Sequence, residues 1–375
     1  MKAHTASFRR IMTRLAAILL AALLLITGTA PAGNAAAEEE RAAQILSQMS
    51  TKEKVAQLMV VAMPAKDAAS VQSKYQFGGY ILFGRDFYRT NKSGMRRLLR
   101  SCQSSSKIPM LMATDEEGGT VVRASLYRKY RKSKFRSPRQ VYRSGKYKGI
   151  TKDTKNKDKF LKSLGLNCNF GPVADVPYKK SNFMYQRAFS TSAGKTSKFV
   201  RLTVTQMGND GVVSALKHFP GYGKNGDTHG KIIRDKRSMT TFVTRDLRPF
   251  RSGIEAGADM IMVSHTIVKA FDNKHPASLS PAVMSYLRKD MGFDGVIITD
   301  GLGMKGVTDF VGGDQGEAAA RAVKAGCDMV CATGNYKACY NSLLKAVQKG
   351  EISGDQLDAS VKRILMMKIR RGIIK

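Results

Sequence analysis

The stretch Gly211-Val-Val-Ser-Ala-Leu-Lys-His-Phe-Pro-Gly-Tyr-Gly-Lys-Asn-Gly-Asp-Thr-His-Gly230 begins with a short apolar run and continues into a loop rich in glycine and polar residues. The apolar run is typical of a buried strand. The glycines and the proline favour an irregular loop over a helix. The sequence therefore predicts a strand that ends at Lys217 and His218, followed by a loop that carries Asp227 and His229.

Seven other short apolar runs alternate with segments of helical periodicity. Eight strands that alternate with helices predict a (β/α)8 barrel, with a doubly wound parallel sheet as the alternative. The barrel is favoured because polar residues follow so many of the strands, and barrel enzymes build their sites at that end. The predicted strands are residues 58–63, 79–83, 109–114, 169–174, 212–216, 259–263, 295–299 and 328–332. The predicted helices are residues 38–49, 196–207, 244–256, 281–291, 315–325, 336–349 and 354–371, with another starting at Ser50 and an insertion at 123–164.

The first residues have the pattern of an export signal. Basic residues up to Arg14 precede an apolar run at 15–26, and small residues follow as far as Ala37. Because this run is too short to span a bilayer comfortably, we predict a secretory signal peptide at 1–37 and one catalytic domain at 38–375. An uncleaved membrane anchor is the alternative. We expect the mature protein to be monomeric and secreted or cell-wall associated.

The charge is unusual, with 63 Lys and Arg against 29 Asp and Glu, a formal net charge of +34. Such a charge favours association with an anionic partner such as a cell-wall polymer, membrane head groups or nucleic acid. Residues 123–148 contain no acidic residue and mix basic with aromatic side chains. They could form a nucleic-acid groove, but the aromatic residues show no regular spacing. We therefore expect a solvated basic loop and electrostatic association with an anionic cell-wall polymer, and we do not expect nucleic-acid binding.

Motifs for metals and cofactors are missing from the sequence. The five cysteines lack a CxxC pair, so buried free thiols are expected. No two histidines are spaced as i and i+4, and there is no HExxH motif or glycine-rich nucleotide loop. We therefore predict no metal and no cofactor.

Two features of the sequence point to chemistry at a sugar carbon. Asp300 follows the apolar run 295–299, and glycines on either side of Leu302 would leave its carboxylate exposed at the strand end. Such a carboxylate is a candidate nucleophile. The imidazole of His229 can donate and accept a proton near neutral pH, and Asp227 can fix its tautomer. Together these three residues predict a double-displacement glycosidase.

Other polar residues at strand ends and on loops could bind a sugar. They supply donors and acceptors for hydroxyl or amide groups, and arginines suit polyols or carboxylates. These candidate binding residues are Asp115, Arg123, Arg187, Lys217 and His218.

Ordered motifs resemble glycoside hydrolase family 3. Lys217-His-Phe-Pro-Gly-Tyr-Gly223 with Asp227-Thr-His229 is similar to the family loop KHFPGHG…D-S-H. Asp115-Glu-Glu-Gly-Gly-Thr-Val-Val-Arg123, Asn169-Phe-Gly-Pro-Val-Ala-Asp175 and Gly292-Phe-Asp-Gly-Val-Ile-Ile-Thr-Asp300 resemble DQEGGRVxR, NFAPVxDV and GFxGxxxxD. The similarity is to the β-N-acetylhexosaminidase branch of NagZ type and runs from about Met49 to the last helix.

The resemblance implies the same roles that the residues suggest. It makes Asp300 the nucleophile and His229 the acid/base with Asp227 as its partner, and it assigns the five binding residues to an N-acetylglucosamine unit. Within the loop, Tyr222 stands for a family His and Thr228 for a Ser, and the spacer before Asp227 is one residue shorter than in many relatives. Gly301 and Thr120 stand where the family often has an acidic residue and an Arg.

The sequence therefore predicts a secreted retaining exo-β-N-acetylhexosaminidase that removes terminal β-N-acetylglucosamine from peptidoglycan or chitin-type fragments. The alternatives are a β-glucosidase or xylosidase of the same family, a glycoside phosphorylase, and a non-catalytic basic protein that binds cell wall or nucleic acid.

Overall fold

The computed structural model describes residues 32–375. Residues 1–31, which include most of the predicted signal peptide, lie outside the described residues, so the signal and its cleavage stay predictions. The chain separates into Met1–Arg41 and Ala42–Lys375, and the barrel belongs to the second unit. Among the helices of residues 32–375, none is both long enough and apolar enough to cross a membrane.

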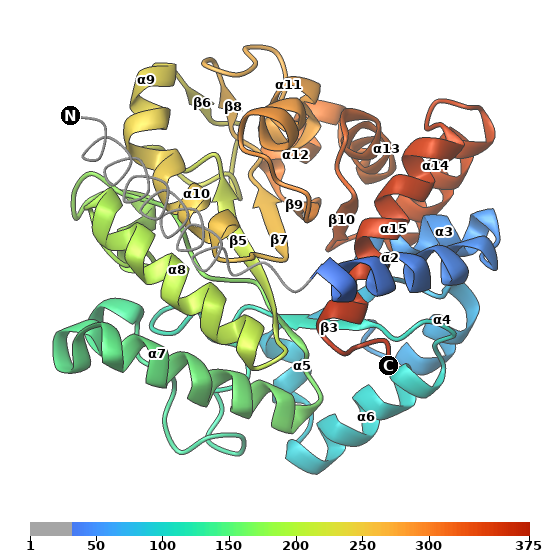
Figure 1. The fold of residues 1–375 in the computed structure, drawn as a ribbon, viewed down its shortest axis with the longest axis horizontal. Coiled ribbons are helices and arrows are strands. Elements are labelled where there is room, and N and C mark those ends of the chain that lie inside the picture. The colour runs from blue at the N-terminus through green and yellow to red at the C-terminus, as the bar shows by residue number, and fades with distance from the viewer. Residues whose placement is uncertain (1–31) are drawn as a thin grey trace, which may run out of the picture. The chain divides into compact units, whose positions relative to one another are not determined.

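Eight parallel strands close into a barrel in the order β1-β10-β9-β7-β5-β4-β3-β2 (Figure 1). Strands that follow one another in the chain are therefore neighbours, which confirms the (β/α)8 barrel and excludes the doubly wound sheet. The barrel strands are β1 (Met59–Ala62), β2 (Gly79–Leu82), β3 (Leu111–Thr114), β4 (Cys168–Asn169), β5 (Val213–Phe219), β7 (Met260–Val263), β9 (Val296–Gly301) and β10 (Met329–Ala332). Two short strands, β6 (Arg234–Asp235) and β8 (Ile267–Val268), pair outside the barrel.

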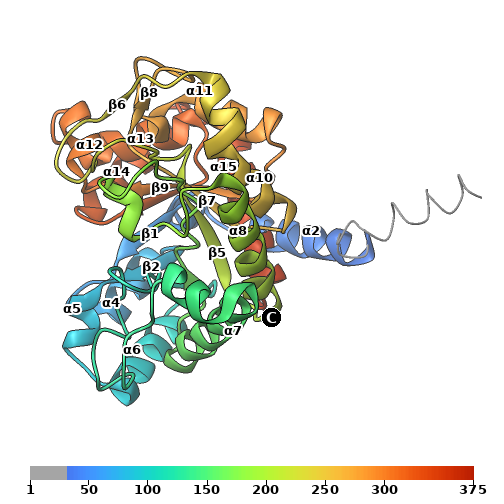
Figure 2. The same cartoon turned by 90° about the vertical axis from the view of Figure 1, so that its left-hand side faces the viewer.

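Helices surround the barrel (Figures 1 and 2). The helix predicted to start at Ser50 is α3, and a capping box is present there: the Ser50 hydroxyl accepts from the backbone N–H of Glu53. The α-helices are α2 (Ala32–Ser47), α3 (Thr51–Gln57), α4 (Ala68–Tyr75), α5 (Gly84–Tyr88), α6 (Lys92–Ser104), α7 (Pro138–Leu164), α8 (Ala193–Asn209), α9 (Met239–Thr241), α10 (Leu247–Glu255), α11 (Pro281–Ser285), α12 (Lys305–Thr308), α13 (Gln315–Ala325), α14 (Tyr336–Gln348) and α15 (Gly354–Arg370). Short 3-10 or π turns are η1 (Phe183–Gln186), η2 (Phe242–Asp246), η3 (Ala277–Leu279), η4 (Tyr286–Asp290) and η5 (Asp309–Val311).

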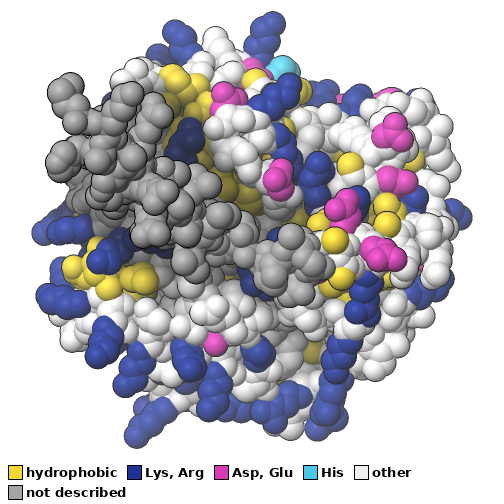
Figure 3. Space-filling view, viewed as in Figure 1, with side chains coloured by type: hydrophobic (Ala, Val, Ile, Leu, Met, Phe, Trp, Pro, Cys, Tyr) yellow, Lys and Arg dark blue, Asp and Glu magenta, His cyan; other side chains and the backbone are white. Residues whose placement is uncertain are grey.

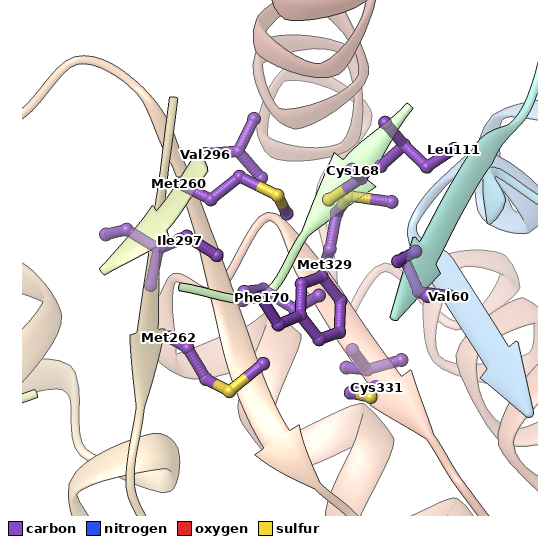
Figure 4. Close-up of a cluster of buried hydrophobic side chains, with 14 of the residues drawn as sticks. Val60, Leu111, Cys168, Phe170, Met260, Met262, Val296, Ile297, Met329 and Cys331 are labelled. Atoms are coloured by element: carbon purple, nitrogen blue, oxygen red, sulfur yellow. The ribbon is translucent and has the colours of Figure 1, made fainter. Parts of the chain in front are cut away.

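The inside of the barrel is filled by apolar side chains from several strands. Figure 4 shows Val60, Leu111, Phe170, Met260 and Met329 gathered in one cluster, and all five are buried. Side chains of this size interdigitate and leave no pore through the barrel. The packed interior therefore fixes the strand ends, from which the polar residues emerge.

Two strands differ from the prediction. β4 ends at Asn169 and does not continue to 174, because Pro172 has no backbone N–H for the ladder; beyond it, Val173 makes only an isolated bridge to Lys217. β5 continues to Phe219, so Lys217 and His218 lie inside the strand and not after it. The pairing with β7 shifts between Lys217 and Phe219, and the Lys217–His218 peptide is cis. Both side chains of this dipeptide face the same cavity.

The insertion after β3 is a basic loop followed by a helix, but the helix already begins at Pro138, so residues 138–148 of the segment expected to be a loop are helical. α7 begins after Ser137, whose hydroxyl accepts from the backbone N–H of Gln140, and ends at Gly165 with a φ of 93°. In Figures 1 and 2, α7 and α8 lie side by side on the outside of the barrel. The aromatic residues Tyr130 and Phe135 of the loop are buried, so the loop presents mainly its basic side chains to solvent.

Candidate active site

One cavity of about 600 Å³ is lined by side chains at or just beyond the carboxyl ends of the barrel strands. Barrel enzymes build their active sites at this end. The eight residues predicted for the site all line this cavity: Asp115, Arg123, Arg187, Lys217, His218, Asp227, His229 and Asp300. Their individual roles stay predictions, but the structure brings every one of them together.

Lys217 is the centre of a buried polar cluster. Its side chain is 2% exposed, and Nζ lies 2.7 Å from Oδ1 of Asp115 and 2.8 Å from Oε1 of Glu117. Burial alone would raise the pKa of both carboxyl groups, but the ammonium of Lys217 contributes to lowering both. Burial alone would lower the pKa of Lys217, but the two carboxylates raise it. All three groups are therefore charged at neutral pH, and Lys217 keeps one N–H for a ligand.

Glu117 also holds Arg187 beside His218. Nε and Nη2 of Arg187 donate to the carboxylate of Glu117 at 3.0 and 2.7 Å. Nη2 also lies 3.2 Å from Nε2 of His218, while the fully buried Asp175 lies 2.8 Å from Nδ1 of the same ring. These contacts fix the orientation of the His218 ring, whose Nδ1 donates to the carboxylate of Asp175.

The loop after β3 positions Arg123. Glu116 is fully buried, and one of its carboxylate oxygens accepts the backbone N–H groups of Arg123 and Ala124 at 3.1 and 2.9 Å. Nη2 of Arg123 reaches Oδ2 of Asp115 at 3.3 Å. Nε of Arg123 is buried and has no hydrogen-bond partner within residues 32–375. A buried donor without a partner costs free energy, and the Arg123 residue as a whole lines the cavity.

Asp300, the predicted nucleophile, lies near the end of β9. The backbone N–H of Gly301 donates to Oδ1 of Asp300 at 2.7 Å. Burial alone would raise the pKa of Asp300. The imidazoles of His218 and His265 act most strongly in the other direction and leave the pKa below its usual value. Asp300 is therefore ionised at neutral pH, as an attacking carboxylate must be.

The predicted acid/base pair lies on a solvent-accessible loop. Nδ1 of His229 lies 2.6 Å from Oδ1 of Asp227, which also accepts the backbone N–H of His229 at 2.9 Å. The two side chains are 62% and 42% exposed, respectively. The carboxylate fixes the tautomer protonated at Nδ1 and leaves Nε2 to exchange a proton with substrate or water.

This loop is anchored to the segment that follows Asp300. The carbonyl groups of Thr228 and His229 accept the backbone N–H groups of Gly306 and Lys305 at 2.8 and 3.3 Å. A Cβ at position 306 would lie 2.9 Å from Thr228, so glycine permits the close approach. Oγ1 of the fully buried Thr228 lies 2.6 Å from Oη of Tyr222. The two residues that replace a His and a Ser of the family pattern therefore contact each other, and the shorter loop still places His229 on the cavity.

Residues that were not predicted also shape the site, among them Glu117, Asp175, Tyr222 and His265. His265 is fully buried, with Nε2 at 3.1 Å from the carbonyl oxygen of Gly301 and Nδ1 at 2.7 Å from Oγ of Ser278. Burial lowers the pKa of His265, while the carboxylate of Asp300 acts in the opposite direction, and Nε2–H can donate to that carbonyl. Asp175 and His265 come directly after predicted strands or one residue later, as Asp115 and Asp300 do, so the same signal could have found them.

None of the five cysteines is paired in a disulfide. All five are buried free thiols, which confirms the prediction. Burial raises the pKa of Cys102 to about 11, so its thiol stays protonated at neutral pH. Over residues 32–375, no three His, Cys, Asp or Glu side chains form a group that could hold a metal ion.

A (β/α)8 barrel whose strand ends bring an ionised aspartate and an Asp-His pair onto one polar cavity defines an enzyme of the glycosidase class. A model of the glycosyl hydrolase family 3 N-terminal domain matches residues 50–367. The chain belongs to glycosyl hydrolase family 3 and is a glycoside hydrolase.

Curated relatives support the same grouping. Beta-hexosaminidase LpqI of Mycobacterium tuberculosis is 30% identical over 337 residues, which cover 87% of this chain and 84% of that protein. Beta-hexosaminidase A of Pseudoalteromonas piscicida is 31% identical over 328 residues, 80% of this chain and 54% of that protein. The barrel is also similar to the solved structure of a family 3 β-N-acetylglucosaminidase from a Paenibacillus species, with a TM-score of 0.82, 29% identity and coverage of 87% of this chain and 64% of that one.

Proposed function

We propose that this glycoside hydrolase is an exported, retaining exo-β-N-acetylglucosaminidase that acts on peptidoglycan or chitin-type fragments. The observation that carries the proposal is the presence, on one cavity, of ionised Asp300 and the Asp227–His229 pair. The names of the relatives, two beta-hexosaminidases and a β-N-acetylglucosaminidase, support N-acetylglucosamine as the sugar.

The mechanism has two displacements at the anomeric carbon. Asp300 attacks that carbon while Nε2–H of His229 protonates the glycosidic oxygen, so the aglycone leaves as an alcohol and a glycosyl ester forms on Asp300. The now neutral Nε2 takes a proton from water, and the oxygen of that water attacks the same carbon and releases the carboxylate of Asp300. Two inversions restore the original β-configuration. The carboxylate of Asp227 stabilises the imidazolium that is present before the first displacement and forms again in the second.

The cluster around Lys217 supplies the contacts for the sugar. Asp115 can accept hydroxyl hydrogens, because its carboxylate is held ionised and keeps free lone pairs. The guanidinium group of Arg123, a residue that lines the cavity, can donate to a hydroxyl or to the carbonyl of an N-acetyl group. These contacts strengthen if the ring flattens towards the transition state, as glycosidases require.

The test compares release of p-nitrophenol from the β-N-acetylglucosaminide and from the β-glucoside. We expect the wild type to favour the N-acetylglucosaminide, and Asp300→Asn to lose at least a thousandfold in kcat, since a neutral amide cannot attack. His229→Ala should lose less on this activated substrate than on one with a poor leaving group. Equal rates for wild type and Asp300→Asn would disprove the assignment, and faster cleavage of the glucoside would move it to a glucosidase. Faster turnover with added phosphate, and a sugar phosphate as product, would make the enzyme a phosphorylase.

Export is tested separately from catalysis. The full chain is expressed in a bacterial host, and the N-terminus of the extracytoplasmic protein is sequenced. We expect a terminus close to Ala37. An intact Met1 on membrane-bound protein would indicate the retained anchor.

A further inference from the structure

A second hollow surface lies beside the substrate cavity. Two cavities of about 600 and 290 Å³ share Arg139, Arg143 and Tyr185 in their walls. We call them together the basic groove. Six cationic side chains line it, and no acidic side chain does: Lys134, Arg136, Arg139, Arg143, Lys180 and Lys195.

The positive charge of the basic groove is not neutralised by the protein. None of its six cations forms an ion pair with a carboxylate in the described part of the chain. Arg139 instead donates to the backbone carbonyls of Tyr185, Ala188 and Phe189. The other five cations are exposed. Figure 3 shows that Lys and Arg also crowd the lower part of the face that it draws, towards α6 and α7 of Figure 1, so positive charge is abundant beyond the basic groove. A groove of one charge sign attracts a polyanion strongly.

The basic groove and the substrate cavity adjoin each other along the chain. Thr120 and Gln186 line the groove, and their neighbours Val121 and Arg187 line the substrate cavity. A polymer whose terminal sugar occupies the cavity can therefore extend into the groove. Thr120 carries no charge, so the positive charge on this wall comes from the loop and helix beyond it.

The aromatic residues of the groove favour a polymer without bases. The guanidinium carbon of Arg139 lies 3.8 Å from the centre of the Tyr185 ring and covers one face of it. Tyr142 packs edge-on against Tyr147 and Phe189, with ring centres 4.8 and 5.2 Å apart. Nucleic-acid grooves need open aromatic faces on which bases stack. Arginines instead suit phosphate groups, which they bind through paired N–H donors.

We propose that the basic groove binds the phosphodiester backbone of a polyol or sugar polymer while the adjoining cavity holds an N-acetylglucosamine that the polymer carries. The identity of the removed sugar rests on the proposed function, but binding of the backbone does not. The groove thus selects, among N-acetylglucosaminides, those attached to a polyanion.

The test neutralises the five exposed cations and leaves the catalytic cavity intact. Arg139 is kept because it holds three backbone carbonyls. The groove variant carries Lys134→Gln, Arg136→Gln, Arg143→Gln, Lys180→Gln and Lys195→Gln. A matched control loses the same charge from exposed positions on α6, on α14 and directly after α14 that line neither the basic groove nor the substrate cavity: Lys92→Gln, Arg97→Gln, Lys337→Gln, Lys345→Gln and Lys349→Gln.

Two measurements separate the outcomes. First, binding of a sugar-free oligo(glycerol phosphate) is measured by calorimetry at low salt. The groove variant should lose at least tenfold in affinity relative to the wild type, and the control less than threefold. The affinity of the groove variant should also depend less on salt concentration than that of the wild type. Second, kcat/KM is compared for p-nitrophenyl β-N-acetylglucosaminide and for N-acetylglucosamine borne on the same oligomer. Only the second substrate should lose at least tenfold in the groove variant.

Equal losses in the groove and control variants would overturn the proposal, because net charge alone would then explain binding. Tighter binding of a single-stranded oligonucleotide than of the glycerol phosphate oligomer would also overturn it in favour of nucleic acid. Inactivity of the wild type on the p-nitrophenyl substrate would refute the proposed function, while the calorimetry would still decide whether the groove binds the backbone.

Discussion

Replacement of Tyr222 by Phe tests whether its contact with Thr228 holds the acid/base loop in place. The Tyr222 side chain is buried, and its Oη lies 2.6 Å from Oγ1 of the fully buried Thr228. Tyr222→Phe keeps the ring and its edge contact with Phe183, whose centre lies 5.7 Å away. The change therefore removes one hydrogen bond and leaves a buried hydroxyl without this partner. The expected cost is about 1–2 kcal/mol.

The size of the catalytic effect follows from this cost. The loss of the hydrogen bond disfavours, by that free energy, the loop position in which His229 reaches the substrate. For a substrate whose leaving group must be protonated, kcat then falls by about 5- to 30-fold. The assay uses aryl β-N-acetylglucosaminides that differ in the acidity of the leaving phenol. Dinitrophenol leaves without a proton, so its release should change less than twofold, while release of unsubstituted phenol should show the whole loss.

Tyr178→Phe is the matched control. Tyr178 is 40% exposed and does not line the substrate cavity, so the loss of its hydroxyl should change neither rate. An equal fall on both aryl substrates for Tyr222→Phe would contradict the argument, because it would place the damage at Asp300 or at the sugar contacts. No change on either substrate would show that the hydrogen bond serves folding alone.

Three further predictions concern the anchor of the loop and two buried titratable groups. Gly306→Ala should force Thr228 away, destabilise the fold by about 1–3 kcal/mol in a denaturant titration, and reproduce the leaving-group pattern of Tyr222→Phe. Burial lowers the pKa of Lys368 to about 7 from 10.5, so the cost of burying its charge is full below pH 7 and decreases towards pH 10.5. Lys368→Met should therefore raise the free energy of unfolding by about 1–3 kcal/mol at pH 6. A smaller gain at pH 6 than at pH 10 would refute this. Burial, and after it the nearby Asp210, raises the pKa of Asp158 to about 8 from 3.8. The stability that this carboxyl group contributes is therefore complete below about pH 4 and is lost as the pH rises to 8. Asp158→Asn should remove this dependence of the thermal unfolding temperature on pH between those values, and an unchanged dependence would contradict it.

The barrel was predictable because its cause is local. Each strand is a short apolar run, such as Val296–Thr299, and the side chains that mark the run in the sequence are the ones buried in the structure. Strand ends depend more on the partner strand. Pairing with β7 extends β5 to Phe219, and β4 ends before Pro172. Neither strand end can be predicted from hydrophobicity alone.

The site was predictable to the extent that its residues follow strands or lie in the family motifs. The pairing between them was not, because it joins residues far apart in the chain. Lys217 lies between Asp115 and Glu117, about a hundred positions away, and the sequence does not say which carboxylate it meets. The contact between Tyr222 and Thr228 is similar, since two departures from the family pattern become one hydrogen bond only when the loop is folded.

The basic segment at 123–148 shows a different limit. Its composition predicted a solvated loop, and its charges are indeed largely exposed. Its aromatic residues behave otherwise, because Tyr130 is buried in the hydrophobic core and Phe135 is buried against Phe160 of α7. Only the fold shows that Lys134, Arg136 and Arg143 lie along one groove beside the substrate cavity.

The central claim, a covalent glycosyl-enzyme on Asp300, is tested most directly by trapping it. The wild-type protein is incubated with a fluorinated N-acetylglucosaminyl fluoride, which forms the ester quickly and hydrolyses it slowly, and the digested protein is analysed by mass spectrometry. We expect one added sugar on the peptide that contains Asp300, and no added mass on the same peptide of the Asp300→Asn variant. A label on another carboxylate, or inhibition with no covalent label, would contradict it.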